Sequence, residues 1–127
     1  MAVGARANVD PERLGFFGLS QAGWIIPLAA KGNPAVRFVV MMSSPTVPTA
    51  VQLAYQTLTG DAVSCLSIAD AARVVHDHAP RTGFDSAPVV AGLGVPGLWI
   101  YGGSDPLIPV TESMATLEGM KTRDPVT

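Results

Sequence analysis

A serine enclosed by small residues is the sharpest chemical signal in the sequence. Ser20 lies within Gly18-Leu19-Ser20-Gln21-Ala22-Gly23, between an apolar segment that precedes it and another that follows. If the first segment is a strand and the second a helix, the chain turns sharply at Ser20. The residues two positions away, Gly18 and Ala22, must then be small to avoid collision. The pattern predicts a serine nucleophile at the start of a helix.

The backbone after Ser20 is suited to stabilising negative charge. Free amides and the dipole at a helix N-terminus favour the charge that develops on a substrate oxygen during acyl transfer. The N–H group of Gln21 is therefore the candidate oxyanion donor. The alternative is an ordinary serine at the beginning of a helix, in a turn that happens to be rich in small residues.

A carboxylate follows a later apolar segment. The run from Val95 to Tyr101 continues into Gly102-Gly103-Ser104-Asp105-Pro106. A glycine-rich turn at the C-terminal edge of a sheet can place a carboxylate beside the nucleophile, where it orients a histidine and stabilises the imidazolium. We expect Asp105 to be this acid. The alternative is an aspartate that only shapes a polar turn.

The histidines of the sequence do not complete such a site. His76 and His78 precede Asp105 and lie two positions apart in a predicted helix, so their side chains point to different faces. This spacing is also poor for a metal pair, because helical ligands favour separations of three or four residues. We expect both histidines on the surface, and the sequence implies no metal and no cofactor.

Alternating apolar and polar segments predict the elements that position these groups. The predicted strands cover 14–19, 36–42 and 95–101, and the predicted helices cover 21–31, 50–58, 66–78 and 110–120, with a short helix near Asp85-Ser86. Strands joined through helices form right-handed parallel units, so the predicted fold class is α/β with three parallel strands and flanking helices. Two helices between the second and third strands exceed one crossover. The segment from about 46 to 83 is therefore predicted to be a small helical lid insertion.

Composition excludes several classes of function. Of 127 residues, 48% are apolar and 14% are charged, which is typical of a single buried domain or a part of one. The net charge of −2, with scattered Lys and Arg, offers no basic stripe for nucleic acid. No apolar run approaches the roughly 20 residues of a membrane span. A single cysteine and the absence of a signal-peptide pattern favour a cytoplasmic location.

The segments around both candidate groups resemble the α/β-hydrolase family. The flanks of Ser20, Val9 to Gly15 and Gly23 to Ala30, are similar to those around the nucleophile in bacterial hydrolases related to dienelactone hydrolases and prolyl-oligopeptidase-like peptidases. The stretch Val95 to Val110 resembles the strand and loop that carry the family's triad acid. The resemblance spans about 9–120, with Ala22 in place of the usual second glycine of the nucleophile motif.

The resemblance implies a partial α/β-hydrolase fold and a serine hydrolase. Ser20 would attack a small-molecule ester, thioester, amide or peptide carbonyl, with Gln21 as one oxyanion donor and Asp105 as the triad acid. The family's order is serine, acid, histidine, so the histidine and the second oxyanion donor would come from sequence outside this chain. We therefore expect a fragment, truncated at both ends and nearly inactive alone.

Two other functions and one physical consequence accompany this interpretation. The chain could be a non-catalytic scaffold, either truncated or a pseudoenzyme, that binds without turnover. It could also be a different doubly wound protein that binds an anion at the helix after Gly18, although no G-x-G-x-x-G pattern is present. If the three strands are neighbours, both outer strands lack partners, and self-association through these uncovered sheet edges is expected.

Overall fold

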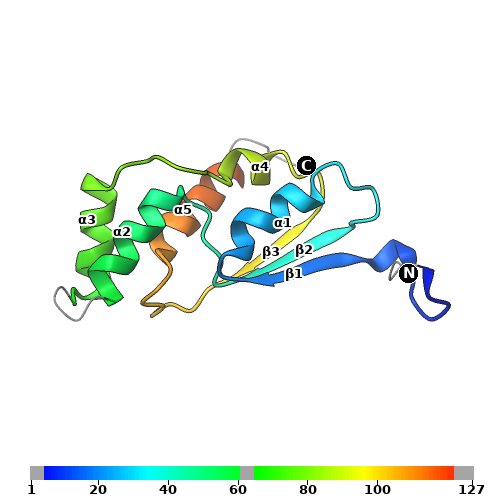
Figure 1. Cartoon of the computed structure of the whole chain (residues 1–127), viewed down its shortest axis with the longest axis horizontal. Helices are drawn as coiled ribbons and strands as arrows, with labels where there is room; N and C mark the ends of the chain where they lie inside the picture. The colour runs from blue at the N-terminus through cyan, green and yellow to red at the C-terminus, as the bar shows by residue number, and fades with distance from the viewer. Residues whose placement is uncertain (1–4, 61–64, 122–127) are drawn as a thin grey trace.

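Three short strands form one parallel sheet. The computed structural model describes residues 5–60 and 65–121. Its strands are β1 (Gly15–Leu19), β2 (Phe38–Met42) and β3 (Gly97–Ile100), hydrogen-bonded in that order (Figure 1). Leu19 is paired with Met42, and Met42 with Ile100, so all three strands end at the same edge. The predicted α/β class and the parallel arrangement are confirmed.

The helices form where the sequence pattern predicts them, with ends displaced by a few residues. They are α1 (Ala22–Ala30), α2 (Thr49–Gly60), α3 (Ile68–His78), α4 (Ala87–Ala91) and α5 (Val110–Lys121), and the short 3-10 turn η2 (Pro11–Arg13) precedes β1. At the short helix α4, the Asp85 carboxylate accepts a hydrogen bond from the Ala87 amide at 2.9 Å, whereas Ser86 makes no capping bond. The residues that begin and end these helices act on backbone groups only a few positions away, so the sequence alone predicts the approximate boundaries.

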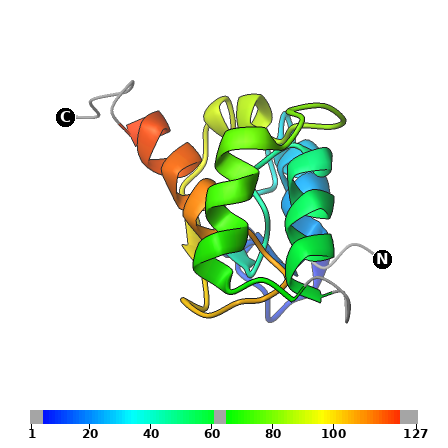
Figure 2. The ribbon, with the colours of Figure 1, turned by 90° about the vertical axis from the view of Figure 1, so that its left-hand side faces the viewer.

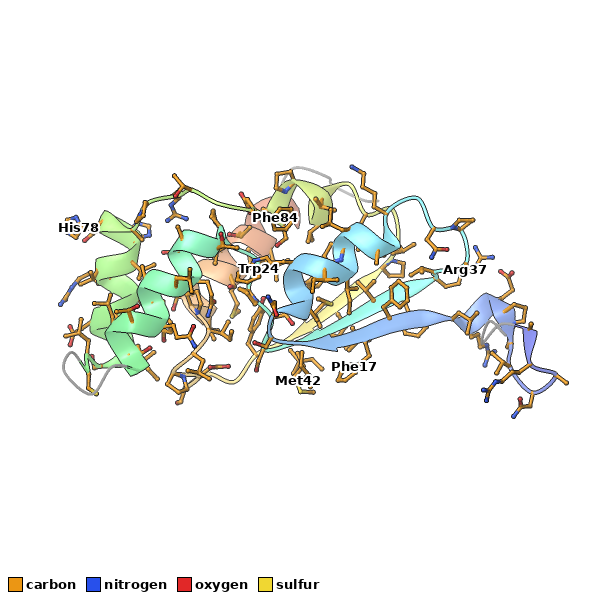
Figure 3. All side chains as sticks on the ribbon, viewed as in Figure 1. Phe17, Trp24, Arg37, Met42, His78 and Phe84 are labelled. Atoms are coloured by element: carbon orange, nitrogen blue, oxygen red, sulfur yellow. The ribbon has the colours of Figure 1, made fainter. Side chains whose placement is uncertain are left out.

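One face of the sheet is covered and the other is open. Helix α1 packs on β1 and β2, and a buried cluster of Ala30, Val36, Val39 and Leu93 lies beneath it. The opposite face carries large apolar side chains that are each at least 37% exposed: Phe17, Leu19, Phe38, Met42, Leu98 and Ile100. Figure 3 shows Phe17 and Met42 pointing away from the helices. This open apolar face is unusual, because parallel sheets normally have both faces covered.

A second core lies beyond the C-terminal ends of the strands. There α3 packs against both α2 and α5 (Figure 2). The cluster at its centre comprises Val47, Val51, Tyr55, Ala71 and Val75, none of them more than 1% exposed. Helices α2 and α3 correspond to the predicted insertion at about 46–83, of which residues 61–64 lie outside the described part. None of the described helices combines the length and the apolar character that crossing a membrane requires.

Candidate active site

Ser20 occupies a strained backbone conformation between a strand and a helix. It directly follows β1, and its φ of 51° lies in the left-handed region, which costs a residue with a Cβ atom roughly 1–2 kcal/mol. Its amide donates to the Met42 carbonyl at 3.1 Å, so β2 holds the turn in place. Helix α1 begins two residues later, at Ala22. The sharp turn predicted at Ser20 is therefore present.

Close packing explains the small residues around this turn. A Cβ atom on Gly18 would collide with the Ala22 methyl group and with the side chain of Ile26. A Cβ atom on Gly23 would lie 2.7 Å from the Pro45 carbonyl oxygen, well inside van der Waals contact. The missing side chain of Gly18 thus leaves room for the methyl group of Ala22. The alanine at that position of the motif is sterically accommodated.

The start of α1 leaves an amide unused beside Ser20. The Gly23 amide donates to the Ser20 carbonyl at 3.0 Å, and the Trp24 amide donates to the Gln21 carbonyl at 3.1 Å. The Gln21 amide donates to no group in the described part of the chain. An amide without a partner at a helix N-terminus is suited to an anion, as expected of an oxyanion donor.

Asp105 lies in the loop after β3, at the same edge of the sheet as Ser20. Its Oδ1 atom accepts from the amides of Leu107 at 2.8 Å and Ile108 at 3.1 Å, which fixes the carboxyl group and leaves Oδ2 for another donor. Ser20 and Asp105 follow strands that flank β2, so about two strand spacings, roughly 10 Å, separate those strand ends. Asp105 itself lies five residues beyond the end of β3.

Helix α2 supports the loop that contains Asp105, a contact that the sequence alone did not predict. Gln52 and Tyr55 donate from their side chains to the carbonyls of Leu107 and Asp105. The Thr59 hydroxyl lies within hydrogen-bonding distance of the Pro106 carbonyl and of the Tyr55 carbonyl in its own helix. The Tyr55 bond measures 3.1 Å. Burial, and then the negative charge of Asp105, raise the pKa of Tyr55 above its ordinary value. The polar residues recur at 52, 55 and 59, one helix face, and this periodicity was the available signal.

A charged cluster joins α3 to α5 and includes His76, one of the two histidines considered in the sequence. Nδ1 of His76 lies 2.8 Å from one carboxylate oxygen of Glu112, and Nη2 of Arg81 lies 2.8 Å from the other. Glu112 is nearly buried, while His76 and His78 are exposed as expected. Burial raises the pKa of Glu112, but the bonds from Arg81 and His76 outweigh it, and the net pKa is below its ordinary value.

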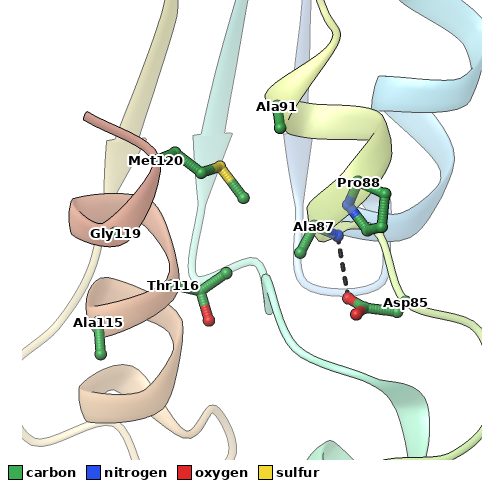
Figure 4. Close-up of a pocket in the computed structure, with 8 residues that line it drawn as sticks. All are labelled: Asp85, Ala87, Pro88, Ala91, Ala115, Thr116, Gly119 and Met120. Carbon is green, nitrogen blue, oxygen red and sulfur yellow. Dashed lines mark hydrogen bonds between the residues drawn. The ribbon is translucent and has the colours of Figure 1, made fainter. Parts of the chain in front are cut away.

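A groove in the described part of the chain is separate from these residues. It lies between α4 and α5, has a volume of about 550 Å³, and is lined mostly by small side chains such as Ala87, Ala91 and Ala115 (Figure 4). Neither Ser20 nor Asp105 lines it. In residues 5–60 and 65–121, His, Cys, Asp and Glu form no group of three that could hold a metal ion.

Comparison of the chain with models of known protein families, and with curated proteins, finds no match to either.

Proposed function

We propose that the chain carries the nucleophile and the acid of a serine hydrolase of the α/β-hydrolase type. Ser20 Oγ attacks the carbonyl carbon of a carboxylic ester, thioester or amide and loses its proton to a histidine base that this sequence does not supply. The Gln21 amide stabilises the oxyanion, and the leaving group departs with the proton from the imidazolium. Water then hydrolyses the acyl group from Ser20 by the same proton relay.

The left-handed backbone of Ser20, between a strand and a helix, carries this proposal. Strain of this kind persists only where the surroundings enforce it, and it is concentrated at functional sites. The bond from the Ser20 amide to the Met42 carbonyl holds this turn, and Gly18 and Gly23 permit the close packing around it, since a side chain at either would collide with its neighbours. The unused Gln21 amide and the free Oδ2 of Asp105 add a donor and an acceptor at the same sheet edge.

The test supplies the missing base as free imidazole. Without it, we expect the purified chain to turn over p-nitrophenyl acetate negligibly, at the same rate as Ser20→Ala, because a triad lacking its base has little residual activity. With imidazole, we expect the wild-type chain to release p-nitrophenol faster than Ser20→Ala. Asp105→Asn should lower this excess, because the imidazolium then loses its counter-charge.

Mass spectrometry locates the acyl group. Trypsin cleaves after Arg13 and Lys31, so Ser20 falls on peptide 14–31, which contains no other serine, threonine or tyrosine. We expect acetylation of this peptide in the wild-type chain. Equal rates in wild type and Ser20→Ala at every imidazole concentration, with no acetylated peptide, would contradict the proposal and favour a non-catalytic scaffold.

Self-association belongs to the same proposal. Strands β1 and β3 are the outer strands of the described sheet, and neither has a strand partner on its outer side there. Each outer edge presents unpaired amides and carbonyls, a template for pairing with another chain. The open apolar face lies between these edges and favours association of the same kind.

A further inference from the structure

Ser20 and Ser43 are the two non-glycine residues with positive φ in the described chain. Ser43 directly follows β2 and has a φ of 43°. Because Leu19 is paired with Met42, the next residues, Ser20 and Ser43, lie side by side at the same edge. The ladder extends to both, since the Ser20 amide donates to Met42 and the Ser43 amide donates to the Ile100 carbonyl at 2.9 Å.

The turn after Ser43 is tied to both candidate catalytic loops. The buried Ser44 hydroxyl donates to the Met42 carbonyl, the same oxygen that accepts the Ser20 amide. The Tyr101 hydroxyl, from the chain that leads to Asp105, donates to the Ser44 carbonyl at 2.8 Å. The Ser44 side chain also packs against Gly23 at the start of α1. These contacts hold Ser43 in its strained conformation.

The side chain of Ser43 remains available to a ligand. It is half-buried, and its hydroxyl has no hydrogen-bond partner among residues 5–60 and 65–121. A position with positive φ that served only as a turn would favour glycine or asparagine. Serine at this position adopts a strained backbone and provides a hydroxyl on the residue that neighbours the candidate nucleophile.

We propose that the Ser43 hydroxyl contacts the acyl group bound at Ser20 and selects acyl groups that carry a hydrogen-bonding oxygen close to the carbonyl. This inference rests on the proposed function. Ser43 takes no part in bond making or breaking. Its contribution is to substrate preference. A change at Ser43 should therefore alter the relative rates of different substrates without abolishing activity.

Two esters of nearly equal size test this inference with the imidazole-supplemented chain: p-nitrophenyl methoxyacetate and p-nitrophenyl butyrate. For each ester the rate with Ser20→Ala is subtracted. The ratio of the two remaining rates is then compared between variants, so that the intrinsic reactivity of the esters cancels. We expect Ser43→Ala to lower the ratio of methoxyacetate to butyrate about two- to tenfold, the effect of one hydrogen bond.

Two further variants separate the hydroxyl from the backbone. Ser43→Gly also removes the hydroxyl but relieves the strain, so it should lower the ratio as Ser43→Ala does, and it serves in its place if the alanine variant does not fold. Ser104→Ala removes an exposed hydroxyl from the loop of Asp105 and should leave the ratio unchanged.

The outcomes distinguish the two proposals. A Ser20-dependent rate with an unchanged ratio in Ser43→Ala or Ser43→Gly would overturn the role of Ser43 alone. Divergent ratios in these two variants would assign the effect to the backbone and also overturn it. If neither ester gives a Ser20-dependent rate, the proposed function fails, and the role of Ser43 fails with it.

Discussion

The sheet and the helical region beyond its C-terminal edge bury their apolar side chains to different extents. In the helical region, the cluster around Tyr55 is at most 1% exposed. In the sheet, the cluster around Val39 and Leu93 is 1–8% exposed, and the opposite face is open. The segment predicted as a lid is thus better packed than the sheet from which it projects. It also holds the Asp105 loop through side chains of α2. An inserted helical segment can therefore be a support and not a cover.

The largest expected effect tests this supporting role at Tyr55. Tyr55→Ala removes a buried ring and the bond to the Asp105 carbonyl, and we expect it to lower the free energy of unfolding by about 3–5 kcal/mol. Tyr55→Phe keeps the ring and should cost only about 1 kcal/mol. Urea unfolding measures both. If Tyr55→Ala lowers the free energy of unfolding by less than about 1 kcal/mol, α2 does not support the Asp105 loop and is only loosely packed against it.

Two adjacent methionines compare the two faces of the sheet. Met41 is fully buried and Met42 is 37% exposed on the open face, although both belong to β2. We expect Met41→Ala to lower the free energy of unfolding by about 2–5 kcal/mol and Met42→Ala by less than about 1 kcal/mol. Equal costs, measured by urea unfolding, would show that the open face is covered in solution.

The charged cluster between α3 and α5 should give a smaller, pH-dependent effect. Glu112→Gln should lower the free energy of unfolding by about 1–2 kcal/mol at neutral pH, an effect moderated by the exposure of His76 and Arg81. The folded-state pKa of Glu112 lies below its ordinary value of 4.5, so its stabilisation is complete above that value and is lost as the pH falls below it.

Urea unfolding at a series of pH values checks this sign. The gap in stability between the wild-type chain and Glu112→Gln should close as the pH falls below 4.5. Glu118→Gln changes an exposed glutamate on the same helix and serves as the control. A gap that widens on acidification would mean that the folded-state pKa of Glu112 lies above its ordinary value of 4.5.

The order and type of the elements could be predicted from the sequence because their signals are local. The small residues Gly18 and Ala22 also predicted the strained turn at Ser20, since the steric requirement acts within a few positions. The open face was not predictable in the same way. Strand β2 reads Phe-Val-Val-Met-Met, apolar on both sides, so its pattern cannot tell a covered face from an open one.

Contacts between distant segments were beyond the sequence. Glu112 and His76 are 36 positions apart, and their pairing depends on how α3 packs against α5. The spacing of Gln52, Tyr55 and Thr59 places three polar side chains on one face of α2 and so indicates a polar contact there. The sequence cannot identify the other side of that contact, because the acceptors are backbone carbonyls, which every residue has. The positive φ of Ser43 likewise depends on contacts of the following turn. A serine at that position does not by itself predict a positive φ, so the sequence did not indicate it.

The smallest effect on stability is expected on the open face, where association is the sensitive measurement. Leu98→Lys changes a side chain that is 55% exposed on this face, so the free energy of unfolding should change by no more than about 0.5 kcal/mol. We expect the wild-type chain to self-associate with rising concentration in sedimentation velocity, and Leu98→Lys to shift it toward monomer, because a lysine placed there resists burial against an apolar surface.

A leucine outside the sheet provides the matched control for this change. Leu53 is 60% exposed on α2, so Leu53→Lys adds the same charge without altering the open face and should leave association unchanged. Association that persists in Leu98→Lys would point to the outer edges of β1 and β3, which the substitution leaves unpaired. A wild-type chain that stays monomeric and unfolds in one cooperative step would contradict both routes. It would mean that the covered face of the sheet, the hydrogen bonds between its strands and the helical core are enough to stabilise the chain while the open apolar face remains exposed to water.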